Sequence, residues 1–222
     1  RPPRSTLFPY TTLFRSEGEV VILTSYAAGV SAFGEDETPG MSTMLRLLFA
    51  NGASTVAAVR VAEAGEVADY QAAFDALGRQ DVQIVVCDST DEAVHQALRT
   101  AVETASASRK ERIGVVGGSG EEASALVEHA AALNSERMVL VGPDVLDEAG
   151  ETLPGAFAAA ALAGVIASNT DPAVPLNGAE IRGLGGVSTD YGDNDIDLLV
   201  RGGVTPLESS GGVLSPVRGI TT

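Results

Sequence analysis

Five short apolar segments alternate with stretches of helical periodicity, and this alternation constrains the fold of the 222-residue chain more than any other feature. Near-continuous runs of Val, Ile and Leu are typical of strands that are buried on both faces, as in parallel sheets. Strand–helix alternation also implies right-handed crossovers. The sequence therefore predicts an α/β fold: a three-layer, doubly wound and mostly parallel sheet with helices on both faces. The predicted strands are Val20–Thr24, Thr55–Val61, Val82–Cys87, Ile113–Val116 and Met138–Val141.

Helical patterns separate these strands. Apolar side chains recur every three to four residues in three segments, and a shorter helix is predicted at Met44–Phe49. Ser89 and Ser119 each stand three residues before a glutamate, a spacing that predicts capping boxes at two helix starts. The segment 155–168 is apolar on nearly every side, so we expect a buried helix there. The three stripes are Val67, Tyr70, Phe74 and Leu77; Val94, Leu98, Ala101, Val102 and Ala105; and Leu126, Val127, Ala130 and Leu133.

The chain divides into three parts. Residues 1–16 are set aside, because residues 6–16 resemble a translated sequencing adapter rather than a segment that evolved to fold. Residues 17–200 are the predicted α/β core domain. Residues 201–222 are predicted as linking strands at the start of a C-terminal β-containing region. We expect the chain to be a fragment of a longer reading frame, since the last predicted strand, Val213–Thr222, ends without a turn and presents an uncovered edge.

The charge balance limits the classes of partner that the chain is expected to bind. Without the three arginines of residues 1–16, 11 basic and 30 acidic side chains remain, a formal net charge of −19. Such a surface repels phosphate backbones and anionic membranes, so neither nucleic acid nor membrane is a predicted partner. The single cysteine excludes an internal disulfide and a multi-cysteine zinc site. The longest apolar run, Ala156–Ala167, is too short to span a bilayer.

One loop has the spacing of a dinucleotide-binding motif. Gly117–Ala123 follows a predicted strand, opens a helix and contains the pattern G-x-G-x-x-A. However, Glu121 and Glu122 would occupy the positive end of that helix, where a pyrophosphate would bind. The loop also follows the fourth strand rather than the first. We interpret it as a structural loop, and a flavodoxin-like nucleotide-binding domain stays an alternative.

A cysteine hydrolase is the second chemical possibility. Cys87 and Asp88 end a predicted central strand, where open α/β sheets often bind ligands. A thiol nucleophile needs a base, and the chain offers only His95 and His129. Both are predicted on helices beside apolar stripes, and we interpret them as residues at the solvent edge. Neither stands at a strand end or in a loop that would suit a serine-hydrolase triad.

An acidic cluster near the end of the chain is predicted to be a solvated turn that precedes or begins a helical turn at Asp195–Arg201. A calcium loop of the EF-hand type would need a glycine and a final glutamate that are not in place here. The sequence therefore predicts no catalytic, cofactor-binding or metal-binding residue, no cofactor and no enzymatic activity. The cluster consists of Asp190, Asp193, Asn194, Asp195 and Asp197.

Several short motifs, in a fixed order, resemble those of contractile tail sheath proteins of bacteriophages and related injection machines. DPAVPLNG at 171–178 follows an Ala-rich helix, and GGVTPLE at 202–208 precedes VRGITT at 217–222. The resemblance extends over nearly all of residues 17–222. The upstream motifs are VVILTSY at 20–26, AFGED at 32–36, LFANGA at 48–53 and AVRV at 58–61.

The resemblance implies a structural role without a chemical step. It implies a subtilisin-like sheath core, in a compact form that lacks the inserted β-rich domain of many sheath proteins. Subunits of this family stack as rings around an inner tube, so the implied partners are further copies, the tail tube protein, and baseplate and tail terminator proteins. The implied location is the phage tail of a virion, assembled in the bacterial host cytoplasm. A non-contractile structural protein of the same particle is a third possibility.

Overall fold

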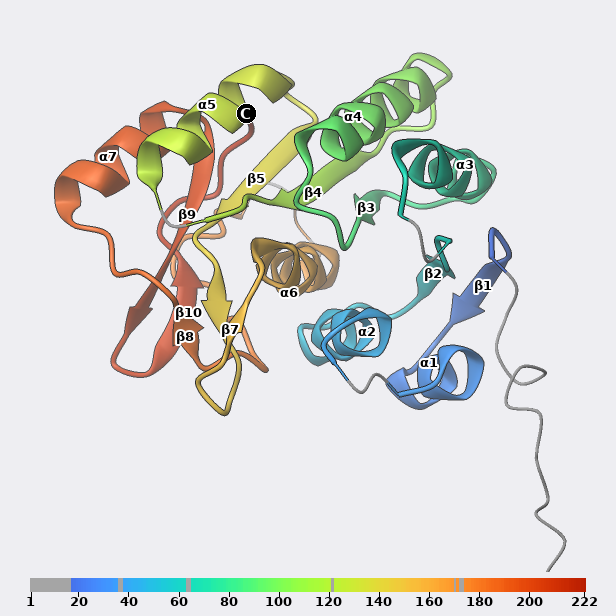
Figure 1. Ribbon diagram of the computed structural model, residues 1–222, viewed down its shortest axis with the longest axis horizontal. Coiled ribbons are helices and arrows are strands. Elements are labelled where there is room, and N and C mark those ends of the chain that lie inside the picture. The colour runs from blue at the N-terminus through green and yellow to red at the C-terminus, as the bar shows by residue number, and fades with distance from the viewer. Residues whose placement is uncertain (1–16, 36–37, 63–64, 121, 170, 172–173) are drawn as a thin grey trace, which may run out of the picture.

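A computed structural model describes residues 17–35, 38–62, 65–120, 122–169, 171 and 174–222 (Figure 1). The adapter-like segment predicted within residues 1–16 lies outside the described residues. In chain order the elements are β1 (Val20–Leu23), α1 (Tyr26–Phe33), α2 (Met41–Ala50), β2 (Val56–Val59), α3 (Val67–Leu77), β3 (Ile84–Val86), α4 (Glu92–Ala107), β4 (Ile113–Gly117), α5 (Ala123–Leu133), β5 (Met138–Gly142), β6 (Val145–Leu146), β7 (Thr152–Leu153), α6 (Gly155–Ser168), β8 (Gly186–Val187), α7 (Asp193–Arg201), β9 (Val204–Ser210) and β10 (Val213–Pro216).

The main sheet has five strands in the order β10-β9-β5-β4-β3. Strands β3, β4, β5 and β9 run parallel, and β10 returns antiparallel to β9 as a hairpin. All five residues of β5 are buried. Val139 and Val141 belong to the core on one face of the sheet, and Met138 and Leu140 to the core on the other. The prediction of a central strand buried on both faces is therefore confirmed here.

Helices cover both faces of this sheet (Figure 1). On one face α6 contacts β3, β4 and β5, and α2 packs against the outer side of α6. On the other face α4 contacts β4, α5 contacts β5 and β9, and α7 contacts α5 and β9. A separate three-stranded sheet, β7-β6-β8, follows β5. The architecture is mixed α/β, as predicted.

The prediction that all five apolar segments join one doubly wound sheet is wrong for the first two. β1 and β2 pair with each other, antiparallel, from Val20 opposite Val59 to Leu23 opposite Val56. They form a two-stranded sheet outside the main one. Ile22 of β1 is 55% exposed, so this apolar run does not mark a strand with two buried faces. The fourth parallel strand is instead β9, which pairs with β5.

The prediction of a buried helix at residues 155–168 is confirmed by α6. Its first ten residues, 155–164, are all buried. Small side chains allow this burial, because backbone from neighbouring elements approaches closely: a Cβ atom on Gly164 would lie 2.7 Å from the carbonyl oxygen of Leu48 in α2. None of the described helices, α6 included, is both long and apolar enough to cross a membrane.

Neither of the two predicted capping boxes forms with the predicted residues. α4 begins at Glu92, and its N-cap is Asp91, whose carboxylate accepts a hydrogen bond from the backbone N–H of Ala93 at 2.8 Å. Ser89 instead accepts a hydrogen bond from the backbone N–H of Asp91. At α5 the N-cap is Glu122, without a side-chain cap. An aspartate two residues nearer the helix therefore replaces the serine as the cap of α4.

The last residues of the chain do not continue the strand that the sequence predicts to Thr222. β10 ends at Pro216, and Thr205 of β9 holds the segment that follows. The Thr205 hydroxyl accepts a hydrogen bond from Ile220 N–H at 3.1 Å and donates one to the Ile220 carbonyl at 3.0 Å. Thr222 N–H donates to the carbonyl of Met138. Two bonds to a side-chain hydroxyl and one main-chain bond thus take the place of regular strand pairing.

The edge of β10, which the sequence predicts to be uncovered, is partly covered by hydrogen bonds from another segment. Ile181 N–H donates to the carbonyl of Leu214 at 2.8 Å, and Gly178 N–H donates to that of Pro216 at 2.9 Å. Gly178 is the last residue of the DPAVPLNG motif, and Ile181 lies three residues after it. β9 and β10 fall within residues 201–222, the predicted linking strands, and both are hydrogen-bonded into the main sheet. The division at residue 200 stays a prediction.

Candidate functional site

Packing explains Gly117 and Gly118, the glycines at the start of the loop with the dinucleotide-like spacing. A Cβ atom on Gly117 would collide with the backbone of Gly155, and one on Gly155 with the carbonyl oxygen of Gly118. The absence of side chains therefore lets the first turn of α6 lie directly against the end of β4. Glu121 lies outside the described residues, and Glu122 is exposed at the start of α5. This close contact favours the structural interpretation of the loop.

Cys87 is a buried thiol rather than an activated nucleophile. The residue is 6% exposed, and burial raises the pKa of its thiol to about 12. Its Sγ atom lies 3.8 Å from the carbonyl oxygen of Ser89. The neighbouring Asp88 accepts a hydrogen bond from the Tyr70 hydroxyl at 2.7 Å. A nucleophilic cysteine needs a depressed pKa, so this environment disfavours thiolate chemistry.

The two histidines contact each other, and the interpretation of both as solvent-edge residues is wrong for His95. The His95 side chain is fully buried, and His129 is half-buried. Nδ1 of His95 lies 2.9 Å from Nε2 of His129, and Nε2 of His95 lies 2.8 Å from the carbonyl oxygen of Ser89. Both ring nitrogens of His95 are therefore engaged, and neither is free to act as a base for Cys87.

The acidic cluster lies around the start of α7, which begins two residues before the predicted helical turn. All five of its members are exposed. Negative charge in the first turn of a helix is favourable, because it faces the positive end of the helix dipole. Asp197 forms an ion pair with Arg201 at 2.9 Å, one turn further along. No group of three potential metal-binding side chains occurs among the described residues.

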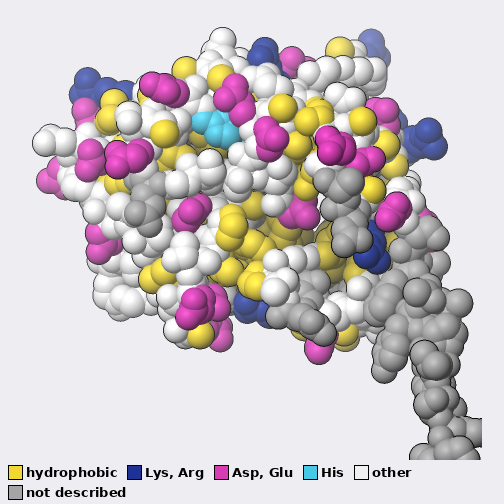
Figure 2. All heavy atoms as spheres, in the orientation of Figure 1, with side chains coloured by type: hydrophobic (Ala, Val, Ile, Leu, Met, Phe, Trp, Pro, Cys, Tyr) yellow, Lys and Arg dark blue, Asp and Glu magenta, His cyan; other side chains and the backbone are white. Residues whose placement is uncertain are grey.

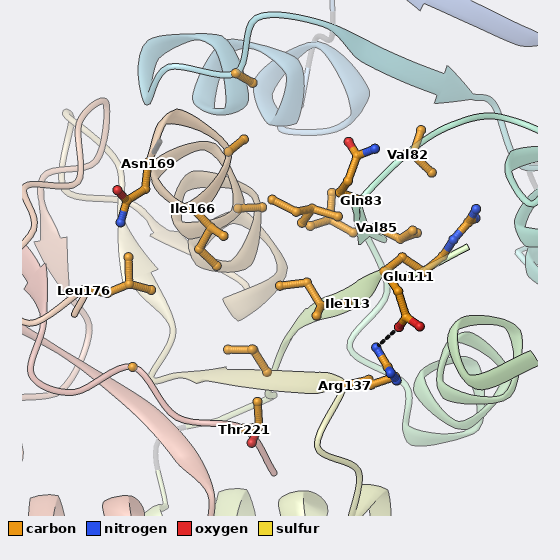
Figure 3. A pocket seen from close by; sticks show the side chains of 18 of the residues that line it. Val82, Gln83, Val85, Glu111, Ile113, Arg137, Ile166, Asn169, Leu176 and Thr221 are labelled. Carbon is orange, nitrogen blue, oxygen red and sulfur yellow. Dashed lines mark ion pairs between the residues drawn. The ribbon is translucent and has the colours of Figure 1, made fainter. Parts of the chain in front are cut away.

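A groove of about 1730 Å³ lies at the amino ends of the parallel strands (Figure 3). Its lining comes from the starts of β2, β3, β4 and β5, the end of α6, the DPAVPLNG loop and the final residues of the chain. Open α/β sheets bind small ligands at the carboxyl ends of their strands. The groove is at the opposite edge, where this fold class does not place its ligands.

Apolar side chains from distant segments meet in the groove. Ile113 of β4, Ile166 of α6 and Leu176 of the DPAVPLNG loop line it together (Figure 3). Ile22 and Val174, two of the large apolar side chains that are at least half exposed, lie in the same lining. An exposed apolar concavity of this kind is typical of a surface that contacts other polypeptide.

Charged residues lie at one side of the groove, and their partners are within the chain. Glu111 and Arg137 form an ion pair at 2.7 Å (Figure 3). Arg112 is 5% exposed and donates to the carbonyls of Leu77 and Gln80 at the end of α3. A cation at the carboxyl end of a helix is favourable, so Arg112 stabilises the end of α3.

Sequence patterns indicate parts of this groove but do not bring them together. Leu176 and Ile220 lie in motifs of the family resemblance, whereas Ile113 and Ile166 belong to a predicted strand and a predicted helix. Strand and helix patterns show which residues are buried in an element. They do not show which segments, separated by fifty residues or more, share a surface.

Comparison with known proteins identifies the family. Residues 64–222 match the family model of the phage tail sheath protein central domain. The chain is 35% identical over 150 residues to the tail sheath protein of Bacillus phage SP01, a match that covers 64% of this chain and 26% of that protein. The chain thus spans about a quarter of the length of this curated relative.

The fold agrees with that match. A contracted helical sheath of the anti-feeding prophage superposes with a TM-score of 0.66 at 19% identity, over 90% of this chain and 56% of that one. A chain of the same prophage's baseplate gives 0.69 at 16% identity, over 89% and 56%. A sheath tail protein from Desulfitobacterium hafniense gives 0.57 at 18%, over 68% and 34%. Since the family model covers most of the chain, the chain belongs to the phage tail sheath protein family.

Proposed function

We propose that this chain is part of a structural subunit of a contractile tail sheath, which polymerises around an inner tube and contracts to drive it through a cell envelope. The family match over residues 64–222 carries the proposal, and the likeness to a contracted helical sheath supports it. The proposed partners are further copies of the subunit, the tail tube protein, and baseplate and terminator proteins. The proposed location is the virion tail, with assembly in the bacterial host cytoplasm.

In this proposal the described residues form a rigid body, and the protein acts through contacts between copies of that body. Heterologous contacts that do not close produce helical assemblies, as a tail sheath requires. Contraction is then a rigid-body rearrangement between two packings of the same bodies. We propose that the main sheet, with α6 on one face and α4, α5 and α7 on the other, is the subtilisin-like core that the family resemblance implies.

The proposed role includes no enzymatic step. Cys87 is buried with a raised pKa, and both ring nitrogens of His95 are hydrogen-bonded. Acidic side chains are spread over most of the face drawn in Figure 2, and basic ones are few. Such a surface keeps a protein soluble at the high local concentration that precedes assembly.

Immunogold electron microscopy tests the proposal directly. An antibody raised against residues 17–222 is applied to the particles that carry this protein, before and after contraction is triggered. We expect gold along the whole extended tail and, after contraction, over a shorter and wider sheath with the bare tube unlabelled. Gold confined to the capsid, the tube or the baseplate contradicts the proposal, and pre-absorption of the antibody with the purified chain serves as the control.

A further inference from the structure

Two imidazole rings stack between α4 and α5. The ring centroids of His95 and His129 are 4.9 Å apart, and the ring planes differ by 18°. α4 and α5 are in contact, and Gln96 of α4 also donates a hydrogen bond to the carbonyl of Ala132 in α5. The chain contains only these two histidines. The contact between the two helices therefore includes both histidines of this chain.

The hydrogen bonds fix which ring nitrogens carry hydrogen. The carbonyl oxygen of Ser89 can only accept, so Nε2 of His95, 2.8 Å away, must be its donor. In a neutral ring Nδ1 of His95 is then an acceptor, and its donor is Nε2–H of His129 at 2.9 Å. Nδ1 of His129 is thus the position that takes up a proton without breaking either hydrogen bond.

A first proton is compatible with this arrangement. On Nδ1 of His129 it makes that ring a cationic donor, which strengthens the hydrogen bond to His95. Burial lowers the pKa of His129, while the nearby carboxylates of Glu92 and Asp91 act in the opposite direction. The His129 side chain is half-buried, so part of this charge can be solvated.

A second proton is not compatible with it. On Nδ1 of His95 it would place one N–H against another, across 2.9 Å, between two positive rings. Burial, together with the charge of His129, lowers the pKa of His95 to about 4, against the raising effects of the Ser89 carbonyl and Asp91. Of the other elements that contact α4, β4 has no titratable side chain, and α3 carries Asp69, the exposed Asp75 and Tyr70, which donates to Asp88. Besides His129, α5 carries the exposed Glu128.

We propose that the His95–His129 pair makes the contact between α4 and α5 sensitive to acid, so that the helices stay together with up to one proton on the pair and separate when a second is forced onto His95. The separated or unfolded state binds more protons than the native state between the ordinary histidine pKa of about 6.5 and the lowered value of about 4. Stability is therefore complete above the upper value and is lost as the pH falls toward the lower one. This inference does not depend on the sheath proposal.

Nitrogen NMR of the full chain, labelled with ¹⁵N only in histidine, tests the arrangement without any substitution. At pH 7.5 we expect two rings in the Nε2–H form and a coupling across the N–H···N bond between them. On acidification Nδ1 of His129 should respond first, and His95 should stay neutral until α5 detaches. Two rings that titrate independently near the ordinary value, or the other tautomer at His95, would overturn the proposal.

Urea unfolding at pH 7.5 and pH 5.0 tests the consequence. Between these values the unfolding equilibrium constant of the wild type should rise roughly 25-fold more than that of His95→Gln, since the pKa change of one group sets this factor. His129→Gln keeps a donor for neutral His95, but its side-chain oxygen can also accept from a protonated ring, so its pH response should be weaker than that of the wild type. Equal responses of wild type and His95→Gln would overturn the proposal, and if His95→Gln fails to fold, the NMR titration decides.

Discussion

At the scale of single residues, one buried hydroxyl holds the end of the described chain. Thr205 is fully buried, and its hydroxyl bonds both the N–H and the carbonyl of Ile220. Thr205→Val keeps the shape of the side chain but leaves both groups without this partner. We expect the free energy of unfolding, measured in urea, to fall by about 1–3 kcal/mol. Thr221→Val, at an exposed threonine next to Ile220, should change it by less than about 0.5 kcal/mol. Equal effects would show that the hydroxyl of Thr205 is not what holds the segment.

Single residues also show which kinds of burial a sequence pattern does not predict. The apolar spacing places Leu98 and Leu126 in the core, and both are 1% exposed. The same spacing leaves His95 at the edge of its stripe, yet the side chain is fully buried. The partner that makes this burial possible, His129, stands 34 residues away on another helix. A polar side chain is buried when a partner satisfies it, and the partner is a property of the tertiary structure.

At the scale of elements, all five predicted strands exist, but the sheet to which each belongs does not follow from its composition. β1 and β5 are both short apolar runs of similar character. β5 is buried on both faces, whereas Ile22 of β1 is half exposed and β1 pairs with β2 in a separate two-stranded sheet. Helix α6 was predictable as buried, because it has no polar face at all. The groove was not, since its lining is assembled from the ends of elements rather than from any one of them.

The contact between α6 and α2 offers a test at the same scale. A Cβ atom on Gly164 would lie 2.7 Å from both the carbonyl oxygen of Leu48 and Cβ of Asn51, positions that the α2 backbone fixes. We expect Gly164→Ala to lower the free energy of unfolding in urea by about 1–3 kcal/mol, because the two helices must move apart. Gly29→Ala is the matched control, since its new Cβ meets the mobile end of Leu45 and gains helix propensity of about 1 kcal/mol. A stabilised Gly164→Ala variant would show that the two helices are not held at this separation.

At the scale of the whole molecule, the remaining alternative is a flavodoxin-like nucleotide-binding domain, and thermal unfolding separates it from a structural body. The groove lies at the amino ends of the strands, and α6 and Leu126 occupy the space where side chains on Gly117 and Gly118 would stand. We therefore expect 1 mM ATP, NAD or FMN to raise the melting temperature by less than about 1 °C. A ligand held with a dissociation constant of 10 µM would add about 2.7 kcal/mol at that concentration, equivalent to a rise of several degrees. Sodium sulfate at matched ionic strength serves as the control, because excluded anions stabilise folded proteins in general. The opposite result would be a rise of several degrees with one nucleotide that sulfate does not produce and that Gly118→Ala abolishes. It would show that this fold binds that nucleotide.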